Sequence, residues 1–176
     1  MKMKYCAVVC LVLFLAGCKV TVKDTDDRIS IKSFSMEDSY GHWYDLYDQD
    51  VVKDISPAIH GGRFDVEWHT HSRDREHYAT LRLSHDRYGH DSIRIWDDIC
   101  GVDGSECSRN TEDLSCHFTM DLYMSCGIIG DPFPNHPEVY VGNMLPYLPK
   151  QLYLVLETCD KSAKHCDSEY HAIELL

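Results

Sequence analysis

Alternating acidic and imidazole side chains make the segment RFDVEWHTHS the place where this chain could bind a metal. In an extended strand, Asp65, Glu67, His69 and His71 project from one face, and a His-x-His step on a strand can chelate zinc or copper. The same alternation is typical of a solvated sheet face. We therefore predict no metal or cofactor and keep His69 and His71 as candidate ligands. Further histidines that could complete such a site follow along the chain: His77, His85 and His90.

Serine, histidine and aspartate are plentiful, but no positioned catalytic motif accompanies them. Neither a G-x-S-x-G elbow nor an HExxH helix occurs in the chain, and these are the patterns that place a nucleophile or a metal-bound water. The formal net charge of -12 opposes binding to nucleic acid or to an anionic membrane surface. We therefore predict a binding protein that is not an enzyme and has no nucleic-acid partner.

The N-terminal segment MKMKYCAVVCLVLFLAGC has the features of an export signal. Two lysines precede an apolar run from Tyr5 to Ala16, which is too short to span a bilayer as a helix but suits a signal peptide. We predict a signal peptide over residues 1–17 and a single domain over 18–176. The letters LAGC also fit a lipobox, in which Cys18 would be acylated. A secreted, extracellular protein and an outer-membrane lipoprotein facing the periplasm both fit these residues.

Six cysteines follow the export segment. An even number of cysteines in an exported chain is typical of disulfides, and the lack of a C-x-x-C pair argues against a zinc knuckle or a thioredoxin-type site. The segment GVDGSE contains two glycines and an aspartate, which can turn the chain so that Cys100 and Cys107 pair. We predict up to three disulfides among Cys100, Cys107, Cys116, Cys126, Cys159 and Cys166.

The segment CHFTMDLYMSC leaves the pairing of Cys116 and Cys126 open. It alternates cleanly, with Phe118, Met120 and two further apolar side chains on one face. As one straight strand it would hold its end residues about 33 Å apart, far beyond the reach of a disulfide. A chain that folds back within the segment would bring the two cysteines together.

Most of the remaining chain alternates with a period of two. In RFDVEWHTHS, the side chains of Phe64, Val66 and Trp68 share one face, and similar runs occur in YATLRLSH, SIRIW, QLYLVLE and YHAIELL. Such alternation is typical of half-buried antiparallel strands. It turns Trp68 inward and Trp96 away from the core. Only SMEDSYGHWYDLYDQD suggests a short helix or an ordered aromatic loop. We predict an all-β fold, an antiparallel β-sandwich stabilised by disulfides.

The order of these features resembles the ML lipid-recognition domains, especially the sphingolipid activator branch that handles gangliosides. HGGRFDVEWH resembles a Gly-led strand of that family, and IRIWDDICGVDGSEC resembles its strand that runs into a Cys-x6-Cys loop. LPKQLYLVLETCDKSAKHC, followed by EYHAIEL, resembles the closing hairpin. The likeness covers most of residues 27–175 and implies that Cys116 pairs with Cys126. VKDTDD lacks the early cysteine of the family, and YGHWYDLYDQDVVKDI looks like an insertion.

The resemblance implies an immunoglobulin-like two-sheet cup whose apolar interior takes a lipid tail or another small apolar ligand. The same side chains could instead fill a sandwich core. We expect a secreted protein that presents or carries a lipid and meets membranes only transiently. The alternative is the lipoprotein anchored at Cys18, acting as an immunity, inhibitor or assembly factor through a protein partner. The candidate ligand-binding residues are Phe64, Val66, Trp68, Leu81, Leu83, Ile93, Ile95, Phe118 and Met120.

Overall fold

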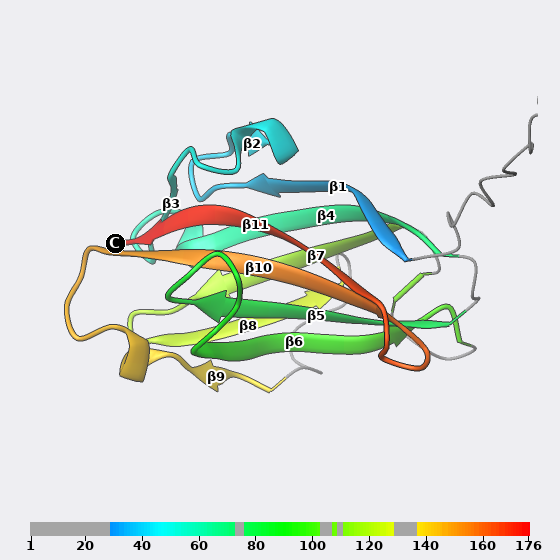
Figure 1. Cartoon of the computed structure of the whole chain (residues 1–176). Coiled ribbons are helices and arrows are strands. Elements are labelled where there is room, and N and C mark those ends of the chain that lie inside the picture. The colour runs from blue at the N-terminus through cyan, green and yellow to red at the C-terminus, as the bar shows by residue number, and fades with distance from the viewer. Residues whose placement is uncertain (1–28, 73–75, 103–106, 109–110, 129–136) are drawn as a thin grey trace, which may run out of the picture.

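Two β-sheets lie face to face in the computed structural model, which describes residues 29–72, 76–102, 107–108, 111–128 and 137–176 (Figure 1). One sheet has the strand order β2 (Trp43–Tyr44), β1 (Ser30–Glu37), β4 (Arg63–His71), β7 (Thr111–Phe118), β8 (Tyr123–Ile128) and β9 (Val139–Tyr140). The other has the order β3 (Lys53–Ile55), β11 (Cys166–Leu175), β10 (Lys150–Asp160), β5 (His77–Ser84) and β6 (Ser92–Cys100).

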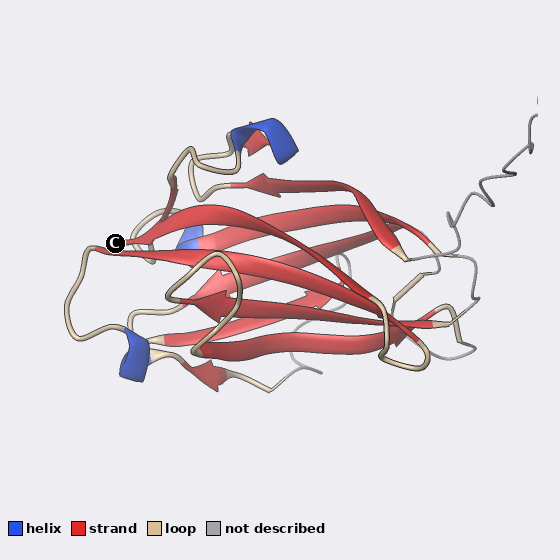
Figure 2. Cartoon of the chain, in the orientation of Figure 1, coloured by secondary structure: helices blue, strands red, loops and turns tan. Residues whose placement is uncertain are grey.

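Antiparallel pairing dominates both sheets, and the β3–β11 pair is parallel. Strands make up most of the described chain (Figure 2), and short 3-10 helices lie at η2 (Leu46–Asp48), η3 (His60–Gly62) and η4 (Gly142–Met144). Within the described ranges, no helix is long and apolar enough to cross a membrane. The predicted disulfide-stabilised β-sandwich is confirmed. The predicted export segment lies outside the described residues.

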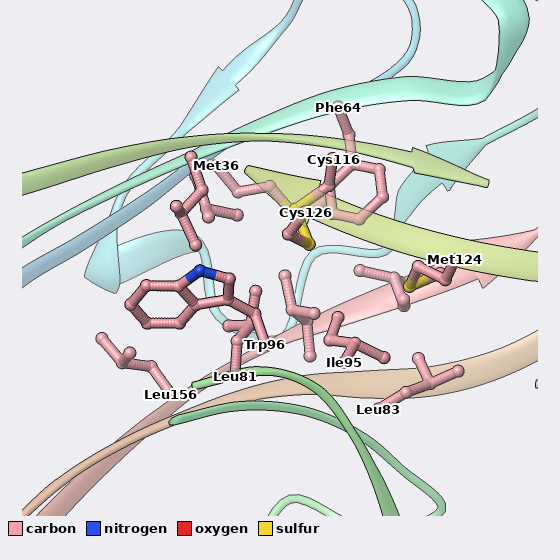
Figure 3. Packing of buried hydrophobic residues seen from close by; sticks show 14 of the residues in the cluster. Met36, Phe64, Leu81, Leu83, Ile95, Trp96, Cys116, Met124, Cys126 and Leu156 are labelled. Carbon is pink, nitrogen blue, oxygen red and sulfur yellow. A yellow bond between two sulfur atoms is a disulfide. The ribbon is translucent and has the colours of Figure 1, made fainter. Parts of the chain in front are cut away.

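The core lies between the sheets and follows the predicted alternation. Phe64, Val66 and Trp68 of β4 point inward and are almost completely buried. Leu81 and Leu83 of β5, in the facing sheet, belong to the same apolar cluster, and Figure 3 shows both together with Phe64. Because burial removes these apolar side chains from water, the alternating pattern accounts for which faces of β4 and β5 are turned toward the core.

The prediction that Trp96 faces away from the core is wrong. Trp96 is only 3% exposed, and its ring meets that of Trp68 edge-on across the two sheets, with centroids 5.5 Å apart. The cause is a bulge in β6, where Leu81 pairs with Trp96 but the next residue of β5 pairs with Arg94. The extra residue, Ile95, shifts the alternation by one, so Ile95 and Trp96 are both buried.

Three disulfides join the described cysteines: Cys100–Cys107, Cys116–Cys126 and Cys159–Cys166. The predicted Cys100–Cys107 pair is confirmed. Cys116 and Cys126 lie opposite each other in the β7–β8 hairpin, so the straight-strand alternative is wrong and the folded-back arrangement holds. Disulfides of this number are typical of proteins that mature in an oxidising environment, such as the extracellular space or the periplasm.

The predicted aromatic segment forms an ordered excursion between β1 and β3. It contains β2 and the single turn η2. Asp45 caps that turn by accepting a hydrogen bond of 2.8 Å from the backbone N–H of Tyr47. This hydrogen bond satisfies a backbone donor at the start of η2 and stabilises the segment. Within it, the side chains of Trp43 and Tyr47 are exposed to solvent.

Candidate functional site

An apolar pocket opens at the end of the sandwich where residue 176 lies, marked C in Figure 1. Its volume is about 270 Å³. None of its lining residues has a charged side chain, and only two, Ser56 and Thr119, contribute hydroxyl groups. The lining residues are Ser56, Pro57, Ala58, Phe118, Thr119, Met120, Leu122, Leu148 and Leu176.

The β7–β8 turn forms one wall of this pocket. Phe118 ends β7 and is fully buried, so it forms an inner wall that is continuous with the core. The turn is closed by hydrogen bonds of 2.9 Å from Thr119 N–H to the carbonyl of Tyr123 and of 3.0 Å from Leu122 N–H to the carbonyl of Thr119. Met120, at the tip, is 76% exposed. The turn thus joins a buried aromatic ring to a solvent-exposed thioether.

The segment after β3 forms another part of the wall. Ser56 and Ile59 close a turn through a 3.0 Å backbone hydrogen bond, which presents Pro57 and Ala58 to the pocket. Gly62 makes the close approach to β7 possible, because a Cβ there would lie 2.0 Å from the carbonyl oxygen of Phe118. The φ angle of Gly62, +75°, also favours glycine.

Two of the predicted ligand-binding residues, Phe118 and Met120, come together at this pocket. Ile93 is partly buried and packs against the core cluster. The other predicted residues lie deeper in that cluster, each at most 3% exposed: Phe64, Val66, Trp68, Leu81, Leu83 and Ile95. The contact between Trp68 and Trp96 fills the space between the sheets at that level.

Sequence reasoning did not assign several wall residues of the pocket to the ligand site: Pro57, Ala58, Leu122, Leu148 and Leu176. Pro57 and Ala58 lie in a turn, and Leu148 precedes β10. The period-two pattern that identifies inward-facing strand residues therefore carries no information about them. Leu122 belongs to an alternating segment, but its place in a turn was not apparent.

The two candidate metal ligands, His69 and His71, lie on the outward face of β4 and are exposed. His69 is in register with Ser33 of β1 and with Thr111 of β7. Among the residues that the structure describes, no group of three or more His, Cys, Asp or Glu side chains could hold a metal ion.

A buried polar pair, Lys53 and His171, lies at the edge where β3 and β11 approach the other sheet. The Lys53 ammonium donates to the carbonyl of Asp48 and, at 3.3 Å, to that of Gln49. Burial lowers the pKa of Lys53 to about 8. The Nε2 atom of His171 donates to the carbonyl of Phe34 at 2.9 Å. Burial, and then the charge of Lys53, lower the pKa of His171 to about 4.

This pair has a structural explanation. Both side chains are fully buried, and each donates to backbone carbonyls, which must be satisfied once they leave water. Neither residue lines the apolar pocket.

The apolar pocket joins buried aromatic surface to exposed apolar surface, and its chemistry is suited to holding an alkyl group. No protein-family model matches the chain, and no curated protein matches its sequence.

Proposed function

We propose that the protein is a non-enzymatic binding protein that takes the end of a lipid tail, or another small apolar ligand, into the pocket between the β7–β8 turn and the segment after β3. The observation that carries the proposal is a lining without charged side chains, which runs from the buried Phe118 ring to the exposed Met120. An exposed apolar surface beside a concave apolar pocket is typical of a ligand-binding site.

The size of the pocket limits what it accepts. At about 270 Å³, it lies just below the range of about 300–1,000 Å³ common for small-molecule sites. It therefore suits a short alkyl segment better than a whole lipid. Burial of each CH₂ group contributes about 0.8 kcal/mol, so five such groups contribute about 4 kcal/mol, and because association itself costs entropy, the Kd from this burial alone is weaker than about 1 mM. A longer alkyl segment would fit only if the walls of the pocket separated.

The hydroxyl groups of Ser56 and Thr119 suggest how a ligand is oriented. They are the polar side chains of the lining, and they can hydrogen-bond a polar headgroup while the alkyl segment contacts Phe118. A likeness to ML lipid-recognition domains would fit this function. On this proposal, residues 1–17 direct export and the mature protein works outside the cytoplasm, either secreted or held at a membrane by a lipid on Cys18.

A binding titration tests the proposal. The probe is dansylaminoundecanoic acid, whose emission rises when its alkyl chain and fluorophore enter an apolar site. Met120→Glu places a charge at the exposed rim, where it does not disturb folding, and burying an alkyl chain against it is unfavourable. We expect at least a tenfold loss of affinity for Met120→Glu. The matched control is Val51→Glu, an exposed apolar position outside the pocket, which should leave affinity unchanged.

Equal loss in both variants, or no binding by the unmodified protein, contradicts the proposal. Urea unfolding of each variant shows whether a loss of binding comes from unfolding. The Val51 position belongs to the aromatic excursion, so this control also separates the pocket from that surface.

A further inference from the structure

A second pocket, of about 490 Å³, lies on the outward face of the six-stranded sheet, where β1 and β7 end and β4 begins. Unlike the first pocket, it is lined largely by charged and polar residues. Its lining residues are Glu37, Asp38, Ser39, Gly41, His60, Arg63, Phe64, Asp65 and His117.

The chain itself satisfies two of the three carboxylates in this lining. Asp65 is 5% exposed and accepts two hydrogen bonds from Arg63, one of 3.2 Å from Nε and one of 2.8 Å from Nη2. Asp38 is also buried. It accepts backbone N–H groups at residues 40 and 42, at 2.9 and 3.0 Å, and the hydroxyl of Tyr44 at 3.0 Å. These two carboxylates shape the pocket.

The third carboxylate, Glu37, is half-buried, and no described residue forms a hydrogen bond or an ion pair with it. The Glu37 carboxylate interacts electrostatically with Arg63, but the guanidinium is already hydrogen-bonded to Asp65. Gly41 lies against the Glu37 carboxylate, since a Cβ built there would be 3.6 Å from Oε1. With neutral histidines, the lining has three carboxylates and one guanidinium, so negative charge is left uncompensated.

The residue paired with Glu37 carries an exposed indole, although it does not itself line the pocket. Glu37 pairs directly with Trp43 across the β1–β2 ladder, and residues paired in this way project from the same face with Cβ atoms about 5 Å apart. Trp43 is 53% exposed. A carboxylate next to an open aromatic face matches a guanidinium, which can stack on the ring while it donates two parallel hydrogen bonds to the carboxylate.

We propose that this pocket receives an arginine side chain from a basic segment of a protein partner, with the guanidinium between the Glu37 carboxylate and the Trp43 ring. The surroundings favour a polypeptide. The excursion that carries Trp43 also exposes Tyr40 and Tyr47, which are 50% and 96% exposed and supply apolar contact area of the kind enriched at interfaces.

Charge complementarity identifies the partner as basic. Aspartates at positions 45, 48 and 50 follow in the same excursion, and Asp54 lies in the adjoining β3, where the neighbouring Lys53 is fully buried. With a chain net charge of -12, the field around this surface steers a positively charged partner toward it. This proposal does not rest on lipid binding, because the two pockets share no lining residue.

The test follows the Trp43 indole N–H resonance in a nitrogen-15 spectrum of the full chain during titration. The probes are tetra-arginine and tetralysine peptides with blocked ends, and spermine, each in physiological salt. The arginine peptide should shift the Trp43 resonance and bind more tightly than the lysine peptide or spermine. Glu37→Gln should weaken binding of the arginine peptide about tenfold, in line with one lost charge-assisted interaction.

Glu67→Gln is the matched control. It removes the same charge from the same sheet face but lies outside the pocket, so binding of the arginine peptide should change less than about twofold. Trp43→Leu should weaken binding of the arginine peptide more than that of the lysine peptide, because a guanidinium stacks better on the indole than an ammonium does.

Three outcomes would overturn the proposal. If Glu37→Gln and Glu67→Gln weaken binding equally, the attraction is general and the pocket does not select. If spermine binds as tightly as the arginine peptide and depends equally on Glu37, the site accepts small polycations and not a protein segment. If the Trp43 resonance does not move, the site does not exist.

Discussion

The buried His171 predicts a specific loss of stability in acid. Its pKa falls from the ordinary value of 6.5 to about 4, first because of burial and then because of the charge of Lys53. The unfolded chain therefore binds a proton between pH 6.5 and 4 that the folded chain does not. Since stability rises with pH wherever the unfolded state binds more protons, the free energy of unfolding must fall as the pH is lowered through this window.

The size of the effect follows from the same values. A difference of one pKa unit corresponds to about 1.4 kcal/mol, so the change of His171 from 6.5 to about 4 corresponds to a loss of about 3 kcal/mol. This is a large part of the total stability of about 5–15 kcal/mol that is usual for a domain. The side chain is fully buried, so solvent does not screen the effect.

His171→Gln isolates this contribution. The glutamine amide can still donate to the carbonyl of Phe34, as Nε2 of His171 does at 2.9 Å, but it does not titrate. Urea unfolding, followed by tryptophan fluorescence with the disulfides intact, gives the free energy of unfolding at each pH from 7 to 4. The wild type should lose about 3 kcal/mol more than the variant over this range.

The carboxylates contribute equally to the two proteins and cancel in the difference. His85→Gln, at an exposed histidine, is the matched control for removal of an imidazole by the same substitution. If the difference between wild type and His171→Gln stays constant from pH 7 to 4, the buried imidazole does not have the lowered pKa.

Two further predictions concern the framework of the apolar pocket. Gly62→Ala should reduce stability by about 1–3 kcal/mol more than Gly61→Ala. Both residues have positive φ, but only a Cβ at Gly62 would lie 2.0 Å from the carbonyl oxygen of Phe118. Equal losses in thermal unfolding would contradict this close approach. Replacing both cysteines of the β7–β8 disulfide by alanine should cost about 1–2 kcal/mol more than the same change in the β10–β11 disulfide. Loop closure contributes about 2.5 kcal/mol to each, but only the sulfurs of the first bridge are buried in the core. Urea midpoints that coincide for the two double variants would show that burial adds nothing.

Much of the fold could be predicted because its strands carry their own pattern. The alternation in β4 places Phe64, Val66 and Trp68 inward, as the structure has them. The prediction for Trp96 is wrong because a bulge is a property of two paired strands. The sequence of β6 alone does not show that one of its residues has no partner in β5. The burial of Lys53 likewise depends on tertiary structure, because its ammonium donates to the backbone carbonyls of Asp48 and Gln49.

The β7–β8 hairpin shows why turns without glycine or proline are difficult to predict. The residues from Thr119 to Leu122 continue the strand-like alternation, and the turn is made possible by Leu122 adopting a φ of +63°, which is uncommon for a non-glycine residue. The pocket depends on this turn and on three other separate segments. Phe118 and Met120 could therefore be named from the sequence, but the walls that complete the pocket could not.

Methyl NMR of carbon-13 methionine gives the most direct test of the claim that the pocket holds an alkyl chain. Met120 is 76% exposed at the rim, while Met36 and Met124 are fully buried in the core. In the presence of lauric acid, we expect intermolecular NOEs between the alkyl chain and the Met120 methyl group, with the Met36 methyl unchanged. An NOE to Met36 without one to Met120, or no NOE to any methionine at saturating ligand, would show that this pocket does not hold the alkyl chain.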